Sequence, residues 1–213
     1  MLSLRKPPAD CLHILQKAWQ KWQQAASNYP NNKHKIPRKQ AMSMRDILPI
    51  IPYLGLFEHH AFGSSTYKVV GEQLEIFFKN KVIGEKLQDK TSVQHAQLNF
   101  HNHISQAVCK KPQGFFLRRS VPTAAETLWH YESLVLPMTN KDDDICYGLL
   151  AGKLSPPACS QSNVWKNLIT FDFSDTRITH FQPIDLGYGV TDITDHVPTE
   201  VTAMPTIPLS QFV

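Results

Sequence analysis

The sequence predicts an α+β fold, in which a five-stranded antiparallel sheet carries helices on one face and follows an N-terminal amphipathic helix. The order of the expected elements is one reason: helix, two strands, short helices, a long helix and three strands. Strands in such runs pair as antiparallel neighbours, with the helices grouped against the sheet. The second reason is the expected strand 126–138, which is apolar on both sides. A sheet buried on both faces needs a second cover, which the amphipathic helix can supply.

The first expected element is a helix that Asp10 caps and that runs to about Ser27. Its apolar residues recur at steps of three and four along one stripe. That stripe contains Leu12, Leu15, Trp19, Trp22 and Ala26. Docking on the sheet of the same chain would bury the stripe, and so would pairing with its copy in a homodimer. The candidate interface residues are Leu12, Leu15, Trp19 and Trp22.

Two short strands are expected at 53–58 and 66–70, where β-favouring residues flank a turn at 59–65. Gly71 then lets the chain turn into a short helix that carries Phe77 and Phe78.

A long helix is expected from about residue 92 to residue 110, and Pro112 stops it. Three strands follow at 115–121, 126–138 and 145–154. In the second of them, Trp129, Tyr131 and Val135 face one way, and Leu128, Leu134 and Leu136 face the other. The Asp-rich segment 139–144 predicts a hairpin turn rather than a cation site. Segments 164–173 and 177–181 predict a further strand pair.

The 213 residues therefore divide into three parts. Residues 1–35 form a basic amphipathic helix and linker, 36–154 the sheet-containing domain, and 155–213 a C-terminal extension with the strand pair.

Basic residues are concentrated near the N-terminus. Residues 1–45 hold nine Lys or Arg and one Asp, a net charge of +8, whereas the rest of the chain carries −4. Lys33, Lys35, Arg38 and Lys39 flank a proline-containing linker. Such an arm can contact nucleic acid, so a nucleic-acid-associated regulator is an alternative function. A solvated arm explains the same charge, and no recognisable reading helix accompanies it.

The four cysteines have irregular spacing and form no C-x-x-C pair. They are too sparse for a disulfide scaffold, so free thiols in a reducing compartment are expected. No signal peptide or membrane span is recognisable, which predicts a cytoplasmic protein.

Seven short motifs occur in order along the chain, at 36–37, 46–47, 54–58, 67–71, 82–87, 131–137 and 145–152. As an ordered set they resemble the PAS domain, and more closely a proteobacterial family of stand-alone PAS-like proteins of largely uncharacterised function. The chain departs from that family at Lys39, Met44 and Lys68, where Arg, Pro and Arg are usual. The resemblance implies a sensory or adaptor module that signals through protein contacts, and it brings no catalytic residues.

The resemblance also implies a small-molecule site between the sheet and the helices. The candidate ligand-binding residues are Phe77, Phe78, His101, Ile104, Phe115, Trp129 and Tyr131. The alternative is that these residues only fill a packed core, which would make the protein a structural interaction partner. The sequence does not name the ligand or any cofactor.

Metal, haem and flavin are not expected. His101 and His103 are two apart on the long helix and point in nearly opposite directions, so they cannot chelate one ion. Cys109 lies at the end of that helix, away from the short-helix region where a flavin would be attached. Hydrolase, P-loop and metalloprotease motifs are also absent from the sequence, so a non-catalytic protein is expected.

Overall fold

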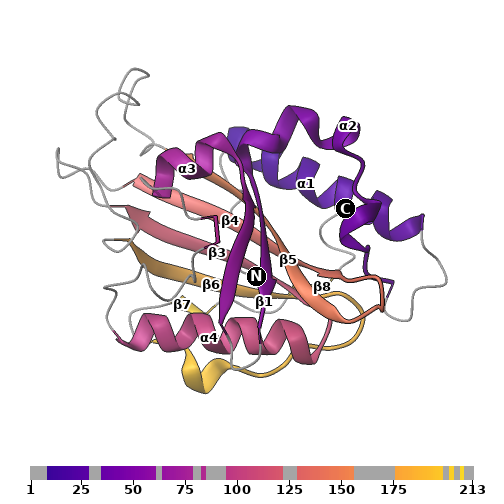
Figure 1. The fold of residues 1–213 in the computed structure, drawn as a ribbon. Coiled ribbons are helices and arrows are strands. Elements are labelled where there is room, and N and C mark those ends of the chain that lie inside the picture. Colours follow the sequence, from indigo (N-terminus) through magenta and orange to yellow (C-terminus); the bar gives the residue numbers. More distant parts are fainter. Residues whose placement is uncertain are drawn as a thin grey trace.

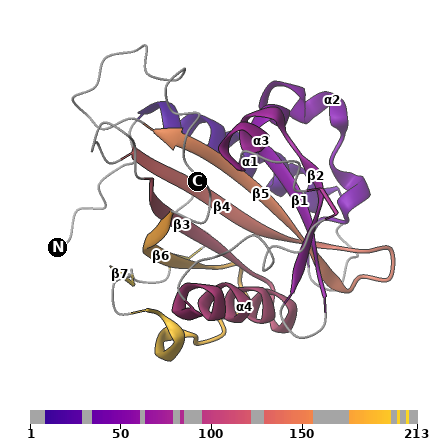
Figure 2. The same cartoon turned by 60° about the vertical axis from the view of Figure 1, so that its left-hand side comes forward.

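In the computed structural model, the chain forms a curved sheet with helices on both faces (Figures 1 and 2). The described residues are 9–28, 35–60, 64–78, 83–84, 95–121, 129–155, 176–198, 202–203 and 207–208. The α+β class and the antiparallel sheet expected from the sequence are both confirmed.

Six antiparallel strands make up the main sheet. They are β1 (Leu54–His59), β2 (Ser65–Val70), β3 (Gln113–Val121), β4 (Trp129–Thr139), β5 (Ile145–Ser155) and β6 (Arg177–Asp185). Their order across the sheet is β2-β1-β5-β4-β3-β6. Two-residue strands β7 (Thr202–Ala203) and β8 (Ile207–Pro208) pair in parallel with β6.

The sixth strand is a difference from the expected five. Residues 177–181 were expected to pair with 164–173, which lies outside the described residues. In the structure β6 pairs with β3 along most of its length. This pairing covers the edge that β3 would otherwise expose. The apolar residues Ile178, Phe181 and Ile184 of β6 are buried by packing on the two faces of the sheet.

Helices cover the sheet on both sides. The helical elements are α1 (Ala9–Ser27), η1 (Lys39–Ala41), α2 (Met44–Ile47), η2 (Leu48–Tyr53), α3 (Glu72–Phe78), α4 (His95–Lys110) and η7 (Thr194–His196). Gly71 precedes α3, as expected, but for a reason of space. A Cβ atom there would overlap the backbone oxygen of Ile51, so the close approach of η2 requires glycine.

Two apolar layers result, one on each face of the sheet. The helix-side core lies between the sheet and α3 and α4, and includes Leu74, Phe100, Ile104, Phe115 and Trp129. The back core lies between the sheet and α1, α2 and η2, and includes Trp19, Trp22, Ile47, Leu134 and Leu136. The two faces predicted for β4 are confirmed for its described residues, with Trp129, Tyr131 and Val135 in the first core.

The tryptophan stripe docks on the sheet of its own chain. Trp19 and Trp22 are 1% and 3% exposed, and their rings stack with centroids 5.4 Å apart. Trp22 Nε1 donates a hydrogen bond of 2.8 Å to the backbone oxygen of Pro137 on β4. Leu15 is buried beside them, whereas the side chain of Leu12 lies outside the described residues. A homodimer built through these side chains would require α1 to leave the sheet.

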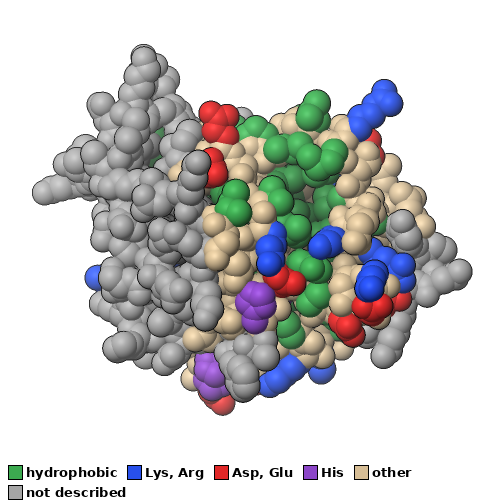
Figure 3. Space-filling model, in the orientation of Figure 1, with side chains coloured by type: hydrophobic (Ala, Val, Ile, Leu, Met, Phe, Trp, Pro, Cys, Tyr) green, Lys and Arg blue, Asp and Glu red, His purple; other side chains and the backbone are tan. Residues whose placement is uncertain are grey.

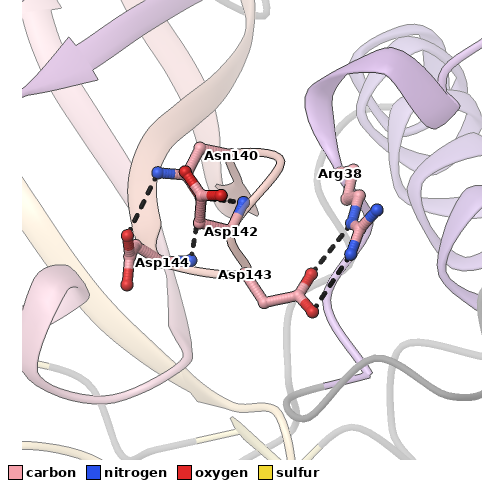
Figure 4. A network of polar contacts seen from close by, with 5 residues as sticks. All are labelled: Arg38, Asn140, Asp142, Asp143 and Asp144. Carbon is pink, nitrogen blue, oxygen red and sulfur yellow. Dashed lines mark hydrogen bonds and ion pairs between the residues drawn. The ribbon is translucent and has the colours of Figure 1, made fainter.

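The Asp-rich segment between β4 and β5 forms the expected hairpin turn (Figure 4). Asn140 Oδ1 accepts hydrogen bonds from the backbone N–H groups of Asp142 and Asp144, at 2.8 Å and 3.0 Å. Asp143 adopts a φ of 64°, a left-handed conformation that Asp tolerates better than most residues.

This turn also holds the linker that follows α1. Arg38 makes a two-pronged ion pair with Asp143, with N–O distances of 2.9 Å and 3.1 Å (Figure 4). The backbone N–H of Thr139 donates to the oxygen of Pro37 at 3.1 Å. The chain between α1 and the sheet is therefore fixed at the β4–β5 hairpin.

Replacing Trp19 by Ala should lower the free energy of unfolding by about 3–5 kcal/mol, because it removes a fully buried indole and leaves Trp22 without its stacking partner. Denaturant titration followed by circular dichroism measures the loss. The matched control is Leu48→Ala, because Leu48 is 66% exposed and should change stability by at most about 0.5 kcal/mol. Equal effects of the two substitutions would show that α1 does not dock as described.

Candidate functional site

Polar side chains interrupt the helix-side core in two places. The arginine cluster consists of Arg119 on β3, Tyr131 on β4, Tyr67 on β2 and Thr176 before β6. The histidine cluster consists of His59 on β1, Ser65 on β2 and Ser105 on α4. All seven side chains are buried. Buried polar groups carry a desolvation cost, so their concentration on one face of the sheet marks a candidate site.

Arg119 faces the helices because of its place in β3. It lies on the same face of the strand as Phe115, Leu117 and Val121, which all belong to the helix-side core. Its own side chain is 3% exposed, and its Nη1 donates to Thr176 Oγ1 at 3.5 Å. Tyr131 is its direct partner in the β3–β4 register, so the two side chains are neighbours on the same face.

Tyr131 extends over the neighbouring strand β5 at a glycine. A Cβ atom at Gly152 would overlap the hydroxyl end of Tyr131, so only glycine leaves room for that ring. Gly148, four residues earlier, accommodates the ring of Phe57 in the same way. Glycines on β5 thus allow two aromatic rings to lie close against the sheet.

The electrostatics of the arginine cluster favour a charged guanidinium beside neutral hydroxyls. Burial lowers the pKa of Arg119 to about 10, so the side chain is still protonated at neutral pH. Burial raises the pKa values of Tyr67 and Tyr131, and nearby Arg119 acts in the opposite direction on both. Both tyrosines keep their protons, so the cluster combines one positive charge with two neutral hydroxyls.

The histidine cluster ties two strands to α4. His59 Nδ1 lies 3.1 Å from Ser65 Oγ, which lies 3.1 Å from Ser105 Oγ. His59 Nε2 is buried and has no hydrogen-bond partner among the described residues. Burial, and to a smaller extent His60, lowers the pKa of His59 to about 4, so its imidazole is neutral at pH 7.

Phe57 connects the two clusters. Its ring meets His59 edge-on with centroids 4.9 Å apart, and Tyr67 with centroids 6.0 Å apart. One aromatic side chain therefore contacts both His59 of the histidine cluster and Tyr67 of the arginine cluster.

Four of the seven predicted ligand-binding residues come together in the helix-side core. They are Ile104, Phe115, Trp129 and Tyr131. Phe77 and Phe78 lie on α3 and His101 lies on α4, but their side chains are outside the described part of the structure. Whether any of the seven contacts a ligand stays a prediction.

Sequence reasoning overlooked Arg119, Tyr67 and His59 as site residues. Residues 59–65 were expected to form a turn, but His59 and Ser65 end and begin paired strands and are buried. A signal for Arg119 was present: it is the charged member of an otherwise apolar alternation at 115, 117 and 121. A charge in that register belongs to the buried face.

A second buried charge lies on the opposite face of β3 and β4. Glu132 is 1% exposed and accepts from Arg118 Nε at 2.8 Å. His130 and His180 lie nearby, and burial lowers the pKa of each. Within the described ranges, no group of three or more His, Cys, Asp or Glu is arranged to hold a metal ion. Arg118 and Glu132 form an ion pair on this face.

No protein-family model matches the sequence, and no curated protein is significantly similar to it. Among solved structures, the chain is similar to the phycoerythrobilin-bound GAF domain from a cyanobacterial phytochrome. The two are 10% identical, and the match covers 73% of this chain and 93% of the GAF domain with a TM-score of 0.25. A likeness at this level does not assign the chain to a family. Separately, none of the described helices is long and apolar enough to cross a membrane.

Gly152→Ala should destabilise the protein by about 1–3 kcal/mol, because the new methyl group displaces the Tyr131 ring. Thermal unfolding measures the effect. Gly55→Ala on β1 is the control, because its Cβ would come no closer than 3.3 Å to the end of the Leu74 side chain and 3.6 Å to Leu150. If Gly152→Ala were the milder of the two, Tyr131 would not lie over β5.

His59 should make stability depend on pH. Its pKa is about 4 in the folded chain against an ordinary value of 6.5, a difference worth about 3 kcal/mol. The neutral form is the one that folds, so this stability is complete above pH 6.5 and is lost as the pH falls towards 4. Denaturant titrations between pH 7 and pH 4 should show a flatter decline for His59→Gln than for wild type.

The control for this measurement is His13→Gln, because His13 is exposed on α1. The stability of His13→Gln should decline with falling pH as steeply as that of wild type. A wild-type slope in His59→Gln would mean that the buried imidazole does not titrate in this range.

Proposed function

We propose that this protein is a non-catalytic, cytoplasmic, PAS-like sensory or adaptor module. It binds a small molecule in the helix-side core and passes the bound state on through protein–protein contact. The arginine cluster is the observation that supports this most. A buried guanidinium and two buried hydroxyls stand in an otherwise apolar layer, and small-molecule sites combine apolar walls with a few placed polar groups of this kind.

The output element in this proposal is α1 on the opposite face. Tyr131 and Gly152 lie on β4 and β5, and the same two strands carry Leu134, Leu136 and Ala151 in the back core. A ligand that shifts Tyr131 would therefore shift strands on which Trp19 and Trp22 pack. Release of α1 would expose the tryptophan stripe to a partner protein or to a second copy of the chain.

Exposed apolar side chains supply a further contact surface for a partner. Met44, Leu48, Val69 and Ile83 are each more than half exposed. Hydrophobic side chains gather near the middle of the face shown in Figure 3. A face on which apolar side chains gather in this way is typical of a protein-interaction site.

The alternative of a nucleic-acid-associated regulator receives less support. Of the four basic residues of the linker, Arg38 is paired with Asp143, and Lys39 donates to the hydroxyl of Tyr147 at 3.1 Å. Lys39 also lies 4.4 Å from the centre of the Tyr147 ring. These two charges serve contacts within the chain, which reduces the charge that the arm could offer to phosphates.

Native mass spectrometry of freshly purified full-length protein tests the proposed function, because it reports retained small molecules and subunit number together. We expect a species heavier than the bare chain by the mass of one small molecule per protomer. Gly152→Ala should retain less of that molecule, while Gly55→Ala should retain the wild-type amount. Protein at the mass of the bare chain, with no small molecule that alters its stability, would favour the structural interaction protein instead.

A further inference from the structure

We propose that the molecule bound in the helix-side core is a small organic acid, whose carboxylate is held by Arg119 together with Tyr131 and Tyr67. This inference rests on the proposed function and specifies its ligand class. It begins from the placement of three polar side chains on one face of the sheet, from strands β3, β4 and β2. All three are more than nine-tenths buried.

The chemistry of the cluster matches an acceptor that carries negative charge. A guanidinium offers only donors, and its planar fork suits the two oxygens of a carboxylate. Because the tyrosines keep their protons at neutral pH, their hydroxyls can donate to the same group. Thr176 is one contact of Arg119 and orients the guanidinium from the β6 side. The set favours a carboxylate over a protonated amine, which the guanidinium would repel.

The charge balance favours a single negative charge. Arg119 is the one lysine or arginine that is buried among the described residues. His59 does not add a second positive charge, because its imidazole is neutral at pH 7. A phosphate monoester carries close to two negative charges at this pH. One guanidinium therefore suits a monocarboxylate better than a phosphate.

The side chains around the arginine cluster indicate that the rest of the ligand, beyond its carboxylate, is apolar. Phe115 and Trp129 lie on the same face of β3 and β4 as Arg119 and Tyr131, and Ile104 and Phe100 of α4 belong to the same apolar core. All four side chains are apolar and at most 5% exposed. An aromatic or aliphatic acid would match both the charged cluster and this lining, whereas a sugar acid would leave its hydroxyls without partners.

Three variants separate charge, geometry and general surface effects. Arg119→Met removes the charge but keeps a long apolar side chain, and replacing a buried charge in this way often leaves a protein folded. Arg119→Lys keeps the charge and loses the fork. Arg177→Met is the control, because Arg177 is exposed on the neighbouring strand β6. Circular dichroism and thermal unfolding establish that each variant is folded.

The first readout is the set of small molecules that each protein releases on denaturation, identified by mass spectrometry. Wild type and Arg177→Met should release an organic acid that Arg119→Met does not retain. The second readout is the shift in melting temperature with benzoate, indole-3-acetate and octanoate, each compared with its primary amide. The acids should stabilise wild type more than the amides do. A charge-assisted contact of this kind is worth about tenfold to a hundredfold in affinity, which Arg119→Met should lose and Arg119→Lys lose in part.

The outcomes distinguish this proposal from the proposed function. A released molecule without an acidic group, or an acid retained equally by wild type and Arg119→Met, would overturn the carboxylate site and leave a ligand-binding module. Equal stabilisation by acids and amides would do the same. If no molecule is released and none of the six compounds stabilises wild type, both proposals fail. Should Arg119→Met not fold, the comparison of acids with amides on wild type still decides.

Discussion

The burial of both faces of β4 and β5 is the constraint on which the rest of the structure depends. Leu134 and Leu136 need α1 as a cover, while Trp129, Tyr131 and Val135 need α3 and α4. A strand with apolar residues on both sides cannot lie at a water-exposed surface without a large hydrophobic cost. Both faces of these strands therefore need a helix layer, and neither layer can replace the other.

This double burial couples the two layers mechanically. Tyr131 lies over β5 at Gly152 on one side, while Trp22 is hydrogen-bonded to Pro137 of β4 on the other. Packed interiors transmit small displacements because they have few voids to absorb them. A movement of β4 relative to β5 would change both contacts together. The linker after α1 is also held at the hairpin of the same two strands, through the ion pair between Arg38 and Asp143. Both α1 and the linker that follows it are therefore fixed to β4 and β5.

The sequence allowed the elements to be predicted better than their partners. The period of two in β4 identified its two faces, and steps of three and four in α1 identified its apolar stripe. What the stripe covers was left open, since a stripe has the same pattern whether it meets a sheet or another copy. Strand β6 was recognised at 177–181, but its pairing with β3 depends on which sheet edge is open, and local residues do not encode that. The site was approached through its aromatic residues, so Arg119 was passed over although its register placed it inward.

The two cores differ in how much their side chains contribute to the stability of the fold. The back core gains from stacked indoles and from leucines on β4, with the Trp22 indole N–H satisfied by a backbone oxygen. The helix-side core contains a charged guanidinium and an imidazole kept neutral by burial, both of which apolar residues would replace at lower cost. Hydrogen bonds between His59 and Ser65 and between Arg119 and Thr176 offset part of this cost. The polar groups of the helix-side core therefore carry a cost in stability that the proposed ligand-binding function would explain.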